Sequence, residues 1–453
     1  MVIVKRGRLA ARAAIIVVLI ALVGVIGALV SAHGVSASPI IATRAVGPDP
    51  SSVAVDVRAG RVFVVNNGDN TITMLDARDG QVLRTISLSG SPAALAVDER
   101  RGHLLIGVTS FRLDGQGTVA TLDSRTSALL HTTDVGSQPN AIAIDQRAGR
   151  AYVANYQGDS LSTLDLASGR TLRTVPVGFD QTTGYAPDEV VVDARAGRVF
   201  VMNSSNNSVS MFDASTGRLL RVLPLGQTAS NATRETGAHL MAVDEAEGHV
   251  FVAASTASGG SIRMLDTRTG TTLHTVRLSW TPDEVLLDAR TRRVFVHSLA
   301  GPELLLDTRT GAVVRTLGLG VGVWDAGHKA VVDERTGRVY VLSETPHDST
   351  GAAVGTGRVL ALDGATGRVL GAVPVGLLPR DLALDSLTNR VFVSNVNDAE
   401  YKRYGYRART GNGSNTWSWV PQPIRGWLPQ ASRSQPLPTG PLSGTVSVID
   451  TTR

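Results

Sequence analysis

Short apolar segments recur along the chain from residue 50 onward, and their length and composition are those of β-strands. Each repeat runs as a Val-, Ile- or Leu-rich segment ending in Asp, a tight turn, a second apolar segment, a third ending in Asp, another turn and a fourth. Gly or Asp bounds the segments, and no stretch keeps a 3.6-residue period long enough to indicate a helix. The pattern therefore predicts an all-β fold.

The Asp residues that end the strands give the number of repeats. First segments end at Asp56, Asp98, Asp145, Asp193, Asp244, Asp288, Asp333 and Asp385. Third segments end at Asp76, Asp123, Asp165, Asp213, Asp266, Asp307, Asp363 and Asp450. Four short strands in a period of 42–52 residues are typical of one blade of a β-propeller. We predict eight four-stranded blades, with seven as the alternative because the sixth repeat has only about five residues between its second and third strands.

The last repeat stops after its third strand, three residues from the end of the chain. The segment Ile40–Gly47 resembles the fourth strand Val369–Gly376, and Pro50 and Pro379 follow the two segments at the same spacing. An N-terminal outer strand is therefore expected to complete the C-terminal blade and to leave no open sheet edge.

The repeat unit resembles that of the YVTN-type β-propeller family. One blade carries the match in Pro139–Asp145, Gly149–Asn155, Ser160–Asp165 and Thr174–Gly178. The resemblance covers residues 40–450. It implies a secreted or surface propeller and does not imply a reaction, because such propellers carry many functions.

The N-terminal segment 1–37 has the features of an export signal. Lys5, Arg6, Arg8 and Arg12 precede an uninterrupted run of 18 apolar and Gly residues, 13–30, and small residues follow. Cleavage before Ser38 would leave a propeller domain of residues 38–453. The run also reaches the length of a membrane span, so a retained anchor is the alternative. Both readings place the propeller outside the cytoplasm, with membrane contact only through 13–30 if the segment is uncleaved.

Charge and composition limit the kinds of partner and metal site that the chain could have. The chain has 44 basic and 39 acidic residues, but residues 1–37 hold four of the basic ones, which leaves 44 − 4 = 40 against 39. The propeller is nearly neutral, so no nucleic-acid partner is expected. The absence of Cys excludes a thiolate-bound metal, so any metal must be bound by His and oxygen ligands.

Fifteen of the strand-ending Asp residues begin a five-residue turn that ends in Gly, except where Ser127, Arg292 and Asn389 replace it. Asp can accept hydrogen bonds from turn amides, and Gly supplies a positive φ. These carboxylates are therefore expected to be structural. The pattern also places both sets of short turns on one face, the turn face, and all longer loops on the other, the long-loop face.

The residues that lead into the innermost strands should surround the mouth of the central channel on the long-loop face. One column of the repeat alignment there contains Asn140, Asp188, His239, Asp283, His328 and Arg380, and the next contains Glu189, Glu284 and Asp381. Asp188, His239, Asp283 and His328 suit a divalent metal or an acid/base pair. The alternative is solvated polarity, with Asp188 and Asp283 paired to His or Arg380. Asn140, Glu189, Glu284, Arg380 and Asp381 are candidate ligand contacts. His103, His249 and His297 fall in or beside second strands and are expected to be exposed.

An insertion at 396–443 separates the second and third strands of the last blade. It holds six Pro residues and a cluster of aromatics that includes Tyr401, Tyr404, Trp417, Trp419 and Trp427. Stiff, aromatic-rich loops suit recognition, although a lid packed on the propeller itself is equally compatible.

These features favour a binding or scaffold module outside the cytoplasm, with a protein, peptide or glycan ligand on the long-loop face. The alternative is an extracytoplasmic lyase or hydrolase with a metal or acid/base site at the channel mouth.

Overall fold

The computed structural model describes residues 40–109, 115–179, 184–226, 240–256, 259–298, 301–317, 330–343, 356–396 and 444–452. These residues form 32 β-strands. None of the residues described belongs to a helix that is long and apolar enough to cross a membrane. The apolar run 13–30 and most of the insertion 396–443 lie outside the described residues.

The strands of each blade follow one another in the sequence. Blades 1 to 4 contain β2 (Pro50–Asp56), β3 (Arg61–Asn66), β4 (Thr71–Asp76), β5 (Val82–Ser87); β6 (Ser91–Asp98), β7 (His103–Thr109), β8 (Gly117–Asp123), β9 (Leu129–Val135); β10 (Pro139–Asp145), β11 (Arg150–Asn155), β12 (Ser160–Asp165), β13 (Thr171–Pro176); β14 (Pro187–Asp193), β15 (Arg198–Asn203), β16 (Ser208–Asp213) and β17 (Leu219–Pro224). Blades 5 to 8 contain β18 (Met241–Asp244), β19 (His249–Thr256), β20 (Gly259–Asp266), β21 (Thr272–Leu278); β22 (Glu284–Asp288), β23 (Arg293–His297), β24 (Glu303–Asp307), β25 (Val313–Leu317); β26 (Ala330–Asp333), β27 (Arg338–Ser343), β28 (Arg358–Asp363), β29 (Val369–Pro374); β30 (Pro379–Asp385), β31 (Arg390–Asn395), β32 (Thr445–Asp450) and β1 (Ile40–Ala45).

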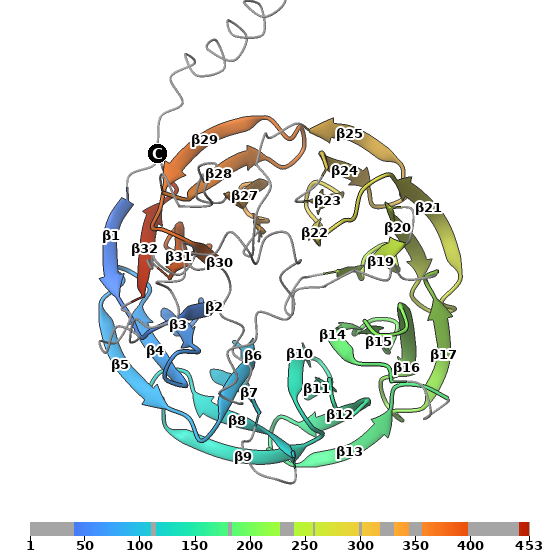
Figure 1. The fold of residues 1–453 in the computed structure, drawn as a ribbon, viewed down its shortest axis with the longest axis horizontal. Coiled ribbons are helices and arrows are strands. Elements are labelled where there is room, and N and C mark those ends of the chain that lie inside the picture. Colours follow the sequence, from blue (N-terminus) through green and yellow to red (C-terminus); the bar gives the residue numbers. More distant parts are fainter. Residues whose placement is uncertain are drawn as a thin grey trace, which may run out of the picture. The chain divides into compact units, whose positions relative to one another are not determined.

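The eight sheets stand around a central axis as an eight-bladed propeller (Figure 1). The first strand of each blade is innermost and contacts the first strands of both neighbouring blades. Blade 6 is complete although its strands have only five residues each, so the prediction of eight blades is confirmed. The predicted closure is also confirmed, because β1 pairs antiparallel with β32 from Ile40–Ile449 to Ala45–Thr445.

The hydrophobic core lies between the blades. Each second strand is apolar and almost wholly buried, because neighbouring blades cover both of its faces. Its third residue is the large buried side chain of the blade, namely Phe63, Leu105, Tyr152, Phe200, Phe251, Phe295, Tyr340 and Phe392. The apolar residues of one blade therefore pack on those of the next around the ring.

The turns that follow the strand-ending Asp residues form as the sequence predicts. Asp56 Oδ1 accepts a hydrogen bond from the amide of Ala59 at 2.8 Å, and Gly60 has a φ of 64°. Where Gly is replaced, Arg292, Asn389 and Ser127 keep this left-handed conformation, with φ of 55°, 56° and 57°. All eight inner Asp residues are at most 4% exposed. The prediction that these carboxylates are structural is therefore confirmed.

Backbone hydrogen bonds join the two short turns of each blade. The amide of Ala77, after the outer-strand Asp76, donates to the carbonyl of Gly60 at the end of the inner turn, at 3.1 Å. The corresponding bond recurs in blade 4, from Ala214 to Gly197, and in blade 8, from Thr451 to Asn389. Both sets of turns therefore lie together on one face, as predicted.

The outer turns carry carboxylates whose hydrogen bonds favour the charged form. Asp213 Oδ1 accepts from the hydroxyl of Ser215 at 2.6 Å and from the amide of Thr216 at 2.9 Å. These donors, the Ser215 hydroxyl above all, lower the pKa of Asp213 from 3.8 to about 2. Because the pKa in the folded state is below that of the unfolded chain, the charged form stabilises the fold above about pH 4, and this stabilisation is lost as the pH falls to about 2.

A substitution at the inner turns tests the backbone argument. We expect Gly60→Ala to lower the free energy of unfolding by about 1–2 kcal/mol through its φ alone, because a Cβ there would meet no atom within 4 Å. Arg292→Gly should raise this free energy by about 1 kcal/mol. Urea unfolding measures both, with Ala59→Ser as a control whose effect stays within about 0.5 kcal/mol. A destabilising Arg292→Gly would contradict the argument.

A second prediction concerns acid. We expect Asp213→Asn to lower the free energy of unfolding by about 1–2 kcal/mol near pH 7, after allowance for solvent screening of a side chain that is 26% exposed. The difference from the parent protein should shrink to near zero between about pH 4 and pH 2. Urea unfolding at constant ionic strength measures it, and Ser215→Ala should follow the same pH dependence with a smaller amplitude. An undiminished difference at pH 2 would refute the assignment.

Candidate functional site

The predicted mouth residues lie where the innermost strands begin, at the end opposite the Asp turns. Asn140 belongs to β10, Asp188 and Glu189 to β14, and Arg380 and Asp381 to β30. Asp283 immediately precedes β22, and Glu284 is its first residue. His239, His328, Tyr401, Tyr404, Trp417, Trp419 and Trp427 lie outside the described residues.

Two of the predicted ligand contacts connect neighbouring blades. Glu189 is 6% exposed, and its Oε2 and Oε1 accept the amides of Leu240 and Met241 in blade 5 at 2.8 and 3.3 Å. Asp381 is equally buried, and its Oδ2 accepts the amide of Val53 in blade 1 at 2.8 Å. Both carboxylates therefore hold the start of the next inner strand. A ligand-binding role for them is untested and remains a prediction.

Four of the other described mouth residues are half-buried. Asn140, Asp188, Asp283 and Arg380 all keep part of their surface accessible. They come from blades 3, 4, 6 and 8, so they are spread around the channel. In the part of the chain that the structure describes, no three His, Asp or Glu residues are grouped so that they could hold a metal ion. The predicted metal set depends on His239 and His328 and stays a prediction.

Aliphatic side chains line part of the channel wall. A cavity of about 720 Å³ is lined by the inner strands of blades 1, 6, 7 and 8, with aliphatic side chains such as Val55, Leu286 and Val331. Asp381 lies at its long-loop end, and Glu334 and Arg335 lie at its turn end. This arrangement suits the binding of a group that is apolar in the middle and polar at the ends.

Blade 6 contains a buried ionisable cluster that sequence reasoning missed. His297 and Glu303 are 0% and 1% exposed, and His297 Nδ1 lies 3.7 Å from Glu303 Oε1. Glu284 is 1% exposed and pairs with His297 in the register of β22 and β23. The expectation that His297 is an exposed strand residue is therefore wrong. A second strand has a blade on each side, so its side chains are not alternately exposed.

The register identifies what these residues replace. In blade 4, Glu189 pairs with Met202 and Met202 with Val209. His297 and Glu303 occupy the positions of Met202 and Val209, where blade 4 keeps apolar residues that are 0% exposed. Buried charge inside an apolar layer costs stability unless it is paired. The signal was present in the sequence as two polar residues at aligned core positions of a single repeat.

The fold and the mouth geometry define an eight-bladed β-propeller with polar residues around the mouth of its channel. The chain belongs to the family described as outer membrane protein assembly factor BamB, whose model matches residues 29–192 and 68–317, the second match alone being more than half of the chain. The β-propeller part of the predicted resemblance is thereby confirmed, whereas the YVTN type is not specifically supported and stays a prediction.

Solved structures show the same fold. The chain is 15% identical to the computationally designed protein Ika8, with a TM-score of 0.57 over 80% of this chain and 98% of that one. It is 16% identical to BamB from Moraxella catarrhalis, with a TM-score of 0.55 over 80% of this chain and 97% of that one. Likeness at this identity shows the fold alone. No curated protein matches the chain in sequence.

The buried pair of blade 6 can be tested by making it resemble blade 4. We expect His297→Met alone to cost about 3–5 kcal/mol of unfolding free energy, because it leaves Glu303 buried beside an apolar side chain. The double variant His297→Met, Glu303→Val should be as stable as the parent or up to about 4 kcal/mol more stable. Met202→Leu in blade 4 is the control for a plain core change. A double variant that is clearly less stable than the parent protein would show that the two side chains stabilise the blade.

Proposed function

We propose that this chain is an exported β-propeller that binds a protein or peptide partner on its long-loop face and serves as a scaffold. The observation that carries the proposal is the set of charged residues at the long-loop end. Asp188, Asp283 and Arg380 lie half-buried where the inner strands of blades 4, 6 and 8 begin. On the turn face, Asp56 Oδ1 and Asp213 Oδ1 accept amides of their own turns and so serve the fold.

Membership of the BamB-described family supports a role in protein interaction, since that family takes its name from an outer membrane protein assembly factor. The export segment 1–37 supports an extracytoplasmic location. The first observation concerns the kind of activity and the second the location, and neither identifies the partner. The YVTN-type resemblance agrees with this reading, because its exported propellers lie at or beyond the cell surface.

The mouth and the insertion supply complementary contacts for such a partner. Charged side chains from blades 4, 6 and 8 would set orientation, because rim charges mainly govern association and specificity. Tyr401, Trp417 and Trp427 in the insertion would supply the aromatic anchors that dominate binding energy at protein interfaces.

Photo-crosslinking from defined positions tests the proposal in cells that express the full chain. A crosslinking amino acid at Asn140 or Arg380 should give a discrete adduct with one protein, whereas the same residue at Arg125, exposed on an outer turn, should not. Replacing 397–443 by a short linker should abolish the adduct while the melting temperature changes little. Removing residues 1–37 should abolish it too, since the chain then stays in the cytoplasm.

Three results would contradict the proposal. Equal adducts from Arg125 would move the interface to the turn face. An adduct that persists without residues 397–443 would show that the aromatic insertion is not part of the interface. An absence of any protein adduct, together with saturable binding to a glycan, would replace the protein partner by a carbohydrate.

A further inference from the structure

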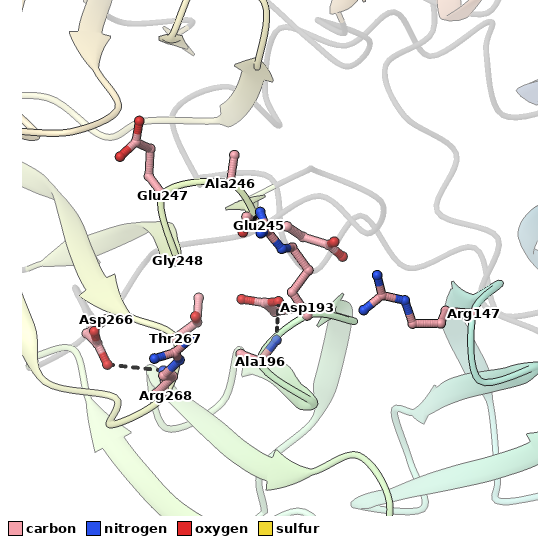
Figure 2. A pocket seen from close by; sticks show the side chains of 11 residues that line it. Arg147, Asp193, Ala196, Glu245, Ala246, Glu247, Gly248, Asp266, Thr267 and Arg268 are labelled. Atoms are coloured by element: carbon pink, nitrogen blue, oxygen red, sulfur yellow. Dashed lines mark hydrogen bonds between the residues drawn. The ribbon is translucent and has the colours of Figure 1, made fainter.

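A polar cavity on the turn face lies between blades 4 and 5. It has a volume of about 590 Å³ and is lined by the inner turns of both blades, by the outer turn of blade 5 and by Arg147 from blade 3. Figure 2 shows Asp193 between Thr267 and Arg147 in that view. This cavity is on the opposite face from the partner surface proposed above.

Two buried oxygen atoms in the wall lack a partner among the described residues. Asp193 is 1% exposed, and its Oδ1 accepts the amide of Ala196 at 2.7 Å, while its Oδ2 has no hydrogen bond there. Thr267 is 0% exposed, and its Oγ1 is likewise without one. A buried carboxylate oxygen without a hydrogen-bond donor lowers the stability of the fold. We therefore expect a ligand to supply the donor for Asp193 Oδ2.

Blade 1 shows how the same position is satisfied elsewhere. Asp56 is the counterpart of Asp193, and its Oδ2 accepts the hydroxyl of Ser124 in blade 2 at 2.6 Å. Ser124 follows an outer-strand Asp just as Thr267 follows Asp266. Between blades 1 and 2 the hydroxyl and the carboxylate thus hydrogen-bond to each other. Between blades 4 and 5 the corresponding Thr267 hydroxyl and Asp193 Oδ2 do not.

Blade 2 shows a second way in which the same oxygen is satisfied from within the protein. Arg101, the fourth residue of that inner turn, donates from Nη1 to Asp98 Oδ2 at 2.9 Å. In blade 4 this position is Ala196, which lines the cavity and has no side-chain donor. Asp193 Oδ2 therefore lacks the donor that Asp98 Oδ2 has.

Other charges of the wall have partners. Glu245 Oε1 accepts the amide of Ala194 at 2.9 Å, and Arg195 Nη1 donates to the carbonyl of Glu245 at 3.2 Å. Glu247 is within 3.9 Å of Arg292 and 3.8 Å of Arg309. Asp193 Oδ2 is the buried carboxylate oxygen of this wall to which the described residues supply no donor.

We propose that this cavity is a binding site for a primary ammonium group, which donates hydrogen bonds to Asp193 Oδ2 and Thr267 Oγ1. An ammonium carries three donors and no acceptor, and a charge-assisted bond to a carboxylate is stronger than a neutral one. A metal ion fits less well, because the described residues place no group of three His, Asp or Glu side chains together. Arg147 and Arg195 at the wall would repel a second positive charge, so the site favours a monoamine or an amino acid over a diamine.

The experiment uses the full chain and ligand-observed saturation-transfer NMR at constant ionic strength. Butylammonium and 5-aminopentanoate should bind saturably, 1,4-diaminobutane more weakly, and pentanoate not at all. Asp193→Asn keeps the acceptor for Ala196 and should weaken butylammonium binding by about tenfold or more. Thr267→Val, which removes only the hydroxyl, should weaken it by a smaller factor.

Two matched variants keep the result interpretable. Ala196→Arg introduces the residue that donates to Asp98 Oδ2 in blade 2 and should block binding by occupying Asp193 Oδ2. Ala59→Arg makes the same change in blade 1, where Ser124 already occupies Asp56 Oδ2, and should leave binding unchanged. Binding that survives Ala196→Arg, an equal loss in Asp56→Asn, or no saturable binding because the cavity holds only water would each overturn the proposal.

Discussion

Each blade buries both of its faces only because a neighbour stands on either side, so the whole structure depends on closing the ring. The pairing of β1 with β32 provides that closure. It supplies the last blade with its outer strand and leaves the first and last blades in contact through β2 and β30. Asp381 reinforces this junction by accepting the amide of Val53 across it. Without the junction, two blade faces would be open to water, and the apolar second strands behind them would be exposed.

The repeated architecture was predictable because its chemistry is local and occurs many times. An Asp that binds the amides of its own turn and a residue with positive φ four positions later recur in almost every hairpin. Because the turn motif occurs fifteen times, it can be recognised even where single copies depart from it. The outer strand at Ile40–Ala45 was also predictable, since it matches the strand that it replaces. Even the turns without Gly kept their conformation, which shows that the surrounding hydrogen bonds impose it.

The site was less predictable because it depends on what differs between blades. Glu189 looks like an exposed mouth residue in the sequence, yet its carboxylate accepts the amide of Leu240, 51 residues later. Asp381 acts over a separation of 328 residues. His297 is buried, contrary to expectation, because neighbouring blades cover both faces of its strand. Such contacts depend on how the blades stack, and no short sequence pattern indicates them. The insertion and the loops that hold His239 and His328 follow no repeat at all.

The closing pair joins residues about 400 positions apart, and this has a consequence for how the molecule is made. Strand β1 is the first part of the propeller to be synthesised, but its partner β32 is among the last. Contacts of such long range form late and slowly. Until then, β1 has no sheet to join and blade 1 has an uncovered flank, which are the surfaces that aggregate most readily. The seam is therefore the point at which a nascent chain most needs protection, and a chain truncated near its end would lose the ring rather than one strand.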